Sequence, residues 1–242
     1  MSLLALHNIS KTFGPLKALS DLSFEVGHSE VVGLLGDNGA GKSTTVNMLS
    51  GIHQPSSGYI SVDGQRQDFT CRRDSAEAGI ETIYQNTALV DSLSISRNIF
   101  LGREITNRFG MLDLRQMRDI SMHVLESAVH ISGIASPDKL VGDLSGGQKQ
   151  AVAIARAVFF KRRVLLLDEP TSALSVRETD ALLGQVLKLK QEGVSSVLVT
   201  HNLYHAYQVC DRFVIMSHGT KVLDVAKADA TIEELTQHVI LT

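Results

Sequence analysis

The chain has 242 residues, of which 43% are hydrophobic and 20% charged, so one or two domains with ordinary cores are expected and extensive disorder is excluded. With 23 basic and 26 acidic residues, the formal net charge is −3, which argues against a nucleic-acid partner bound by bulk charge. The two cysteines, Cys71 and Cys210, have the spacing of neither a metal knuckle nor a small disulfide framework.

The sequence contains no pattern of a secretory signal or a membrane span. Residues 1–4 lack a basic segment, and apolar runs such as residues 31–35 are far shorter than the ~20 residues that cross a bilayer. We therefore expect a soluble chain that reaches a membrane only through a partner.

The amino-terminal part predicts strands around a glycine-rich loop. Residues 22–26 alternate apolar and polar side chains, which is typical of a half-buried strand. Residues 31–35 are continuously apolar, as in a strand buried on both faces of a parallel sheet, and residues 43–49 suit a helix. A further strand is expected at residues 59–64, entering an Asp-Gly turn.

The remainder of the chain alternates helical and strand patterns. Residues from about 87 to 160 show helical periodicity and loops, and we interpret them as an inserted helical subdomain. Further strands are predicted at residues 164–167, 196–200 and 212–216. Apolar residues at positions 182, 186 and 189 predict an amphipathic helix that ends near residue 193. This alternation predicts a doubly wound α/β core.

Residues 36–43 match the phosphate-binding pattern G-x-x-x-x-G-K-[ST] and lie between a predicted buried strand and a predicted helix. The glycines allow backbone N–H groups to face phosphates, and the helix N-terminus adds partial positive charge. Lys42 would reach the β- and γ-phosphates, and the Ser43 hydroxyl would ligate Mg²⁺. The residues expected to bind ATP here are Gly36, Asn38, Gly39, Ala40, Gly41, Lys42, Ser43 and Thr44.

Two acids follow the strand predicted at residues 164–167. Asp168 at the strand tip can hold Mg²⁺ through water, and Glu169 can polarise the attacking water. The alternative is that both are exposed acids that end a strand.

Residues 144–148, Leu-Ser-Gly-Gly-Gln, predict a helix start. Ser145 and Gln148 have the spacing of a capping box. The same arrangement offers an anion a hydroxyl, free N–H groups and the helix dipole.

The sequence resembles the ATP-binding-cassette ATPases over essentially the whole chain. The resemblance rests on the order and spacing of the phosphate loop, Gln85, residues 144–148, Asp168-Glu169 and His201. The resemblance implies a single ATP-binding domain over residues 1–242. Its fold would be a P-loop NTPase (RecA-like) core with an N-terminal antiparallel β subdomain and an inserted α-helical subdomain. It also implies a head-to-tail homodimer in the ATP-bound state. Each ATP would then lie between one subunit's phosphate loop and the Ser145, Gly146, Gly147 and Gln148 of the other.

The resemblance also implies roles for single residues. Gln85 would contact Mg²⁺ and report on the γ-phosphate, His201 would hold the γ-phosphate and the catalytic water, and Phe13 would stack on adenine. The expected catalytic residues are thus Glu169, His201 and Gln85, and the expected Mg²⁺ ligands are Ser43, Gln85 and Asp168. The plain alternatives are a polar loop residue for Gln85, a strand-end histidine for His201 and a core aromatic for Phe13.

One position departs from the family pattern, because Ser175 stands where most cassettes have aspartate. The departure leaves open how the two ATP sites communicate. Ser175 and residues 78–86 and 94–104 resemble the monosaccharide-importer branch, of fructose or ribose type. Many members of that branch carry two fused cassettes, whereas this sequence carries one.

We therefore expect an ATPase that powers a bacterial importer for a monosaccharide such as fructose or ribose. It would bind permease subunits at the cytoplasmic face of the inner membrane and act with an extracytoplasmic sugar-binding protein. A cassette of another transporter class, such as an exporter or an amino-acid importer, is a first alternative. A soluble cassette acting on DNA or ribosomes is disfavoured, because the sequence has no long heptad insertion and no basic arm.

A permease helix is expected to dock on residues 87–104. Leu89, Leu93, Ile95 and Ile99 are apolar in a segment otherwise suited to the surface. The alternative is that these four side chains pack inside the helical insertion.

Overall fold

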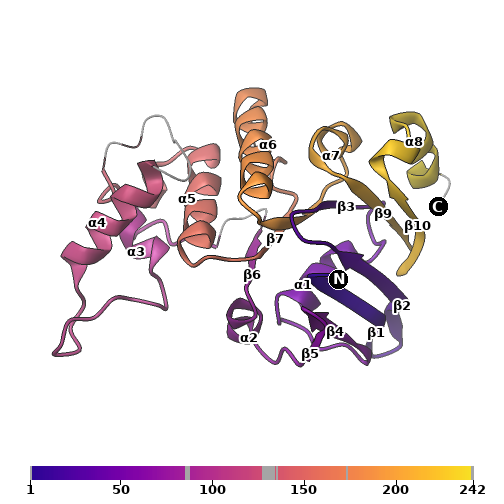
Figure 1. Cartoon of the computed structure of the whole chain (residues 1–242), viewed down its shortest axis with the longest axis horizontal. Helices are drawn as coiled ribbons and strands as arrows, with labels where there is room; N and C mark the ends of the chain where they lie inside the picture. The colour runs from indigo at the N-terminus through magenta and orange to yellow at the C-terminus, as the bar shows by residue number, and fades with distance from the viewer. Residues whose placement is uncertain (1, 85–87, 127–133, 135, 173, 241–242) are drawn as a thin grey trace. The chain divides into compact units, whose positions relative to one another are not determined.

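The computed structural model describes residues 2–84, 88–126, 134, 136–172 and 174–240. The chain forms two compact units. The first consists of Met1–Tyr84, Arg162–Pro170 and Leu183–Thr242, and the second of Gln85–Lys161 and Thr171–Leu182. Figure 1 shows the helices and strands, coloured by residue number from indigo at the N-terminus to yellow at the C-terminus.

A four-stranded antiparallel sheet opens the first unit, in the order β2-β1-β4-β5. Its strands are β1 (Leu4–Phe13), β2 (Leu16–Val26), β4 (Ser57–Val62) and β5 (Gln65–Gln67). The alternation at the end of β2 buries one face, as predicted, and a turn at residues 63–64 connects β4 to β5.

A six-stranded sheet in the order β10-β9-β3-β8-β7-β6 forms the centre of the first unit. Its strands are β3 (Val31–Leu35), β6 (Ile80–Ile83), β7 (Val164–Asp168), β8 (Ser195–Val199), β9 (Arg212–Ser217) and β10 (Thr220–Ala226). All pairings are parallel except that of β10 with β9. Every residue of β3 is buried, which confirms the strand predicted from its continuous apolar run. Strand β6 was not predicted, because its four residues are too few for a periodicity.

Helices α1 (Lys42–Leu49), α2 (Arg72–Glu77), α7 (Leu203–Val209) and α8 (Ile232–Ile240) also belong to the first unit, with a 3₁₀ turn at Lys227–Asp229. Helix α6 (Val176–Gln191) contributes its residues up to Leu182 to the second unit and the rest to the first. Before α8, the Thr231 N–H and hydroxyl donate to Glu234 Oε2 at 2.8 and 3.0 Å, a capping box that stabilises the helix start.

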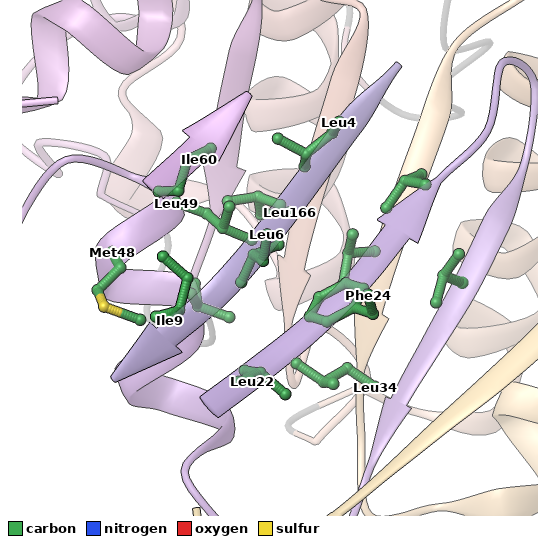
Figure 2. Packing of buried hydrophobic residues seen from close by; sticks show 14 of the residues in the cluster. Leu4, Leu6, Ile9, Leu22, Phe24, Leu34, Met48, Leu49, Ile60 and Leu166 are labelled. Atoms are coloured by element: carbon green, nitrogen blue, oxygen red, sulfur yellow. The ribbon is translucent and has the colours of Figure 1, made fainter. Parts of the chain in front are cut away.

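One hydrophobic cluster joins the two sheets and α1 in the first unit. Figure 2 shows its members Leu6 and Phe24 from the antiparallel sheet, Leu34 and Leu166 from the parallel sheet, and Leu49 from α1. All five are at most 3% exposed. Burial of apolar surface stabilises the folded state by about 25 cal/mol per Å² of area removed from water. It therefore holds the end of β3 and the start of α1, where the phosphate loop lies, on a rigid base.

The second unit is mainly helical. It contains α3 (Ile95–Ile99), α4 (Leu114–Val124), a 3₁₀ turn at Val141–Asp143 and α5 (Gly146–Phe159). Isolated bridges pair Ser94 with Leu140 and Thr106 with Leu112. The Asn98 side chain is fully buried and bonds to the backbone of Val90, Leu93 and Ser94, which fixes the segment that leads into α3.

The prediction that Ile95 and Ile99 form a docking surface is wrong. Both side chains are 0% exposed and belong to the interior of the second unit, because the short helix α3 turns them inward. For these two residues the packing alternative holds. Leu89 and Leu93 are partly exposed, so only these two of the four remain available to a partner.

Among the described residues, no helix has the length and apolar character required to cross a bilayer.

Candidate functional site

The phosphate loop connects β3 to α1, as the sequence predicts, and two of its glycines are required by geometry. Gly36 has φ +144°, and a Cβ there would lie 2.3 Å from the Met216 carbonyl oxygen. Gly41 has φ +103°, and a Cβ there would lie 2.6 Å from a Leu19 methyl group. Helix α1 begins at Gly41 without a side-chain cap and without an acid in its first turn. Its first N–H groups therefore suit an external anion.

Lys42 turns its ammonium group back onto the loop. Its Nζ donates to the carbonyl oxygens of Gly36 at 2.7 Å and Asp37 at 2.9 Å, and the residue is 8% exposed. Burial lowers the Lys42 pKa, while the charges of Glu169, Asp37 and Asp168 oppose this shift. The loop thus holds a cation against its own carbonyl groups.

The other loop residues differ in exposure. Asn38, Gly39 and Ser43 are exposed, Thr44 is partly exposed and Ala40 is buried. The Ser43 hydroxyl therefore lies where a ligand can reach it.

Asp168 and Glu169 lie at the end of β7, which β8 separates from β3, the strand that leads into the loop. Strand β7 ends at Asp168 and pairs with β8, which pairs with β3, and all three are parallel. The carboxyl ends of parallel strands meet at one edge of a sheet, where α/β proteins bind ligands. Burial raises the Asp168 pKa, the charge of Glu169 raises it further, and Lys42 opposes both.

This chemistry fits a magnesium ion. Asp168 offers a carboxylate whose charge is poorly compensated, and Ser43 offers an exposed hydroxyl. In the described part of the chain, no three His, Cys, Asp or Glu side chains gather as a metal cage. Mg²⁺ commonly takes one or two protein oxygens and completes its shell with water and substrate phosphates.

Glu169 and His201 form a close pair. The Glu169 Oε1 accepts the His201 backbone N–H at 3.0 Å and lies 2.9 Å from His201 Nδ1. The Glu169 side chain is 20% exposed and that of His201 71% exposed, so the pair borders solvent. Glu169 has φ +49°, and its N–H donates to the Val199 carbonyl at 2.9 Å. The backbone thus holds the carboxylate in a conformation that few non-glycine residues adopt.

Phe13, at the end of β1, is 39% exposed and is therefore not a core aromatic. The His53 ring packs against it in a T-shaped contact with ring centres 5.2 Å apart, and Lys11 Nζ lies 5.1 Å from the Phe13 ring centre. An exposed aromatic ring with a nearby cation is a suitable surface for a purine base.

The segment at residues 144–148 lies in the second unit and starts α5. Ser145 is the N-cap: its Oγ accepts the Gln148 N–H at 3.3 Å, while Gln148 Oε1 accepts the Ser145 N–H at 3.1 Å. The predicted capping box is confirmed. Gly146 and Gly147 form the first turn.

Sequence reasoning missed Glu178, in the first turn of α6. Its Oε1 accepts the Ser145 hydroxyl at 2.9 Å and the Gly147 N–H at 3.2 Å. Its Oε2 accepts the Ser175 N–H at 3.0 Å and the Ser175 hydroxyl at 2.9 Å. These hydrogen bonds, first those from the Ser175 backbone and side chain and then that from Ser145, lower the Glu178 pKa to about 2. The Ser-x-x-Glu spacing signals the helix cap but not the contact with Ser145.

The structure thus brings the phosphate loop, Asp168, Glu169, His201 and Phe13 into the first unit and places residues 145–148 in the second. Gln85, expected to be a catalytic residue and a Mg²⁺ ligand, lies outside the described residues.

Comparison with known families identifies two that each cover more than half of the chain. A family described as ABC transporter matches residues 19–172, and a family described as P-loop domain matches residues 116–240.

Curated relatives differ in their sequence identity to the chain and in the share of their own length that it covers. The xylose/arabinose import ATP-binding protein of Sulfolobus acidocaldarius is 42% identical over 97% of this chain and 92% of its own length. The ribose import ATP-binding proteins of Chromobacterium violaceum and Hahella chejuensis are 40% and 36% identical, over 93% and 99% of this chain. The chain spans only 44% and 47% of the lengths of these two ribose proteins.

Solved structures share the fold. A nucleotide-free ATP-binding cassette from an ABC transporter superposes with a TM-score of 0.83 at 24% identity, covering all of this chain and 96% of its own. A cassette in its ADP conformation gives 0.82 at 23% identity, with 100% and 98% covered. A dimeric cassette in a post-hydrolysis state with ADP and phosphate gives 0.77 at 24% identity, with 93% and 98% covered. The predicted α/β cassette fold is confirmed.

Proposed function

The chain belongs to the ABC transporter family of ATP-binding cassettes, and we propose that it is the ATP-hydrolysing subunit of a monosaccharide importer. The observation that carries this proposal is the common sheet edge: the uncapped phosphate loop follows β3, Asp168 and Glu169 lie at the end of β7, and β8 pairs in parallel with both strands. The import ATP-binding relatives for xylose/arabinose and ribose support a sugar as the transported substrate.

ATP binds with its phosphates on the loop of residues 36–44 and its adenine on the exposed ring of Phe13. The Lys42 ammonium moves from the loop carbonyl groups to the β- and γ-phosphate oxygens, because a phosphate anion is a stronger acceptor than a carbonyl group. Most of the catalytic effect is positioning and electrostatic stabilisation, as in other phosphoryl transfers.

Glu169 accepts a proton from the attacking water, and His201 holds the γ-phosphate and the Glu169 carboxylate together. The contact between Oε1 and Nδ1 keeps the carboxylate at the edge of the site, and the exposed imidazole remains within reach of the substrate. A bound Mg²⁺ would supply charge neutralisation for the phosphates, with Ser43, Asp168 and Gln85 as its protein ligands.

Two copies close head to tail over ATP. Each copy's Ser145, Gly146, Gly147 and Gln148 then face the γ-phosphate on the other copy's loop. The capped start of α5 suits this role, since its hydroxyl and N–H groups lie at the positive end of the helix dipole.

The whole chain acts as one cassette domain in which residues from about 87 to 160 form the helical subdomain. Permease subunits dock on the segment around Leu89 and Leu93, whose side chains are partly exposed. Through them the chain is peripheral to the cytoplasmic face of the inner membrane. An extracytoplasmic sugar-binding protein delivers the substrate to the permease.

The test is to purify the chain with its co-purifying permease from detergent-solubilised membranes and to measure ATPase activity in proteoliposomes. A monosaccharide with its binding protein should stimulate hydrolysis several-fold, whereas amino acids and nucleic acid should not. Stimulation by an amino acid, or copurification with nucleic acid and no membrane protein, would contradict the proposal.

A further inference from the structure

One carboxylate oxygen of Glu178 accepts hydrogen bonds from two groups at the start of α5. These are the Ser145 hydroxyl at 2.9 Å and the Gly147 N–H at 3.2 Å, both within the second unit. They are the same donors that, under the proposed function, face the γ-phosphate held by the partner copy.

We infer that Glu178 is an internal anion that occupies the phosphate-facing donors of Ser145 and Gly147, and that the partner's ATP displaces it when the dimer closes. The inference rests on the proposed function, because it concerns the same site in the ATP-bound homodimer.

The two donors cannot bind Glu178 and a phosphate at the same time. A serine hydroxyl and a backbone N–H carry one proton each, and both protons are donated to Glu178. A phosphate oxygen accepts these bonds as a carboxylate does, so the two anions compete for the same donors. They also repel each other when they approach one serine hydroxyl from the same side.

Ser175, at the start of the same helix, fixes the position of the Glu178 carboxylate. Ser175 binds the second carboxylate oxygen through its N–H and its hydroxyl, and it accepts the Glu178 N–H at 3.4 Å. The first oxygen is thereby aimed at α5. Contact is close: a Cβ on Gly147 would lie 2.8 Å from both Glu178 Cγ and Glu178 Oε1, so only glycine leaves room for the carboxylate.

Glu178 is therefore a positioning residue with two effects. It keeps the start of α5 ordered in the separate subunit, and it raises the ATP concentration at which two subunits close. ATP binding to a single subunit does not change, because the phosphate loop belongs to the first unit.

The experiment follows MgATP-driven dimerisation of the Glu169→Gln chain by light scattering, with and without Glu178→Gln. The amide keeps the shape but replaces charge-assisted hydrogen bonds by neutral ones, so the midpoint ATP concentration should fall about three- to tenfold. Nucleotide affinity of the monomer, measured with a fluorescent ATP analogue, should remain unchanged.

Two further variants separate this role from helix capping. Glu178→Asp keeps an acid next to Ser175 but shortens the side chain by one methylene, which withdraws it from Ser145. It should lower the midpoint while preserving the melting temperature. Glu234→Gln is the matched control, since Glu234 forms the same capping box with Thr231 on α8, which belongs to the first unit.

The possible outcomes test the role of Glu178 and the proposed function separately. If the Glu169→Gln parent dimerises but both Glu178 variants leave the midpoint unchanged or raise it, the inference is overturned and the proposed function stands. An equal shift with Glu234→Gln also overturns it, because capping alone would then explain the effect. A parent that stays monomeric at every MgATP concentration overturns both.

Discussion

Glu169 and His201 are 32 positions apart in the chain and are joined twice through a single oxygen atom. Glu169 Oε1 accepts the His201 backbone N–H at 3.0 Å and lies 2.9 Å from the His201 Nδ1. A carboxylate oxygen accepts hydrogen bonds, so the His201 tautomer that pairs with Glu169 carries its proton on Nδ1. The ring is therefore oriented with Nε2 away from Glu169, and substitutions at the two positions are expected to have different effects.

Replacing Glu169 by glutamine should stop hydrolysis and preserve ATP binding. The amide keeps the shape but accepts a proton poorly, and loss of a general base costs about 10²–10⁴ in rate. Lys42, Ser43 and Asp168 are untouched, so an ATP-bound dimer should accumulate on size exclusion with MgATP. Lys42→Ala is the opposing control and should neither bind ATP nor dimerise. Turnover near the wild-type rate would exclude Glu169 as the base.

Replacing His201 by alanine should lower kcat by about 10²-fold with little change in KM. The backbone N–H contact to Glu169 survives the substitution, so the carboxylate stays in place and only the imidazole is lost. Because the side chain is 71% exposed, the melting temperature should not change. His28→Ala, in the turn at the opposite end of β3, is the control. A kcat within twofold of wild type would remove His201 from the mechanism.

Charge at Ile95 and at Leu93 should have different consequences. Ile95 is 0% exposed, so Ile95→Asp buries an unpaired carboxylate and should lower the free energy of unfolding by more than about 3 kcal/mol. Leu93 is partly exposed, so Leu93→Asp should fold and hydrolyse ATP in isolation but fail to copurify with permease. Urea unfolding and pull-down from solubilised membranes measure the two effects. Normal copurification of Leu93→Asp would place the docking surface elsewhere.

The low pKa of Glu178 predicts an acid-sensitive contribution to stability. Its pKa is lowered from 4.5 to about 2, so its stabilising contribution is complete above about pH 4.5 and is lost as the pH falls towards 2. The stability difference between wild type and Glu178→Gln, from urea unfolding at pH 6 and pH 3, should therefore shrink at the lower pH. Ser175→Ala removes one of the donors to the carboxylate and should shift this loss to higher pH. A difference that stays constant between pH 6 and pH 3 would contradict the assignment of these hydrogen bonds.

Local patterns in the sequence were sufficient to predict much of the fold and the phosphate site. The apolar run of β3 and the alternation in β2 were read correctly, because burial on one face or both determines such periodicities. The loop between β3 and α1 was found from consecutive residues, since backbone N–H groups that face a phosphate require glycine at fixed spacing. The capping box at Ser145 was also found, because its two partners are three residues apart.

Tertiary structure decided what depended on residues far apart in the chain. The same Ser-x-x-Glu pattern occurs at Ser175, but its glutamate also binds Ser145, 33 positions away, and no local periodicity encodes that contact. Ile95 and Ile99 resembled a surface stripe and proved to be interior, because burial depends on which helices pack around a segment. The pairing of Glu169 with His201 likewise follows from β7 and β8 being neighbours in the sheet. Chain neighbours thus determine turns, caps and strand faces, whereas the order of the strands and the packing of the helices determine which side chains meet.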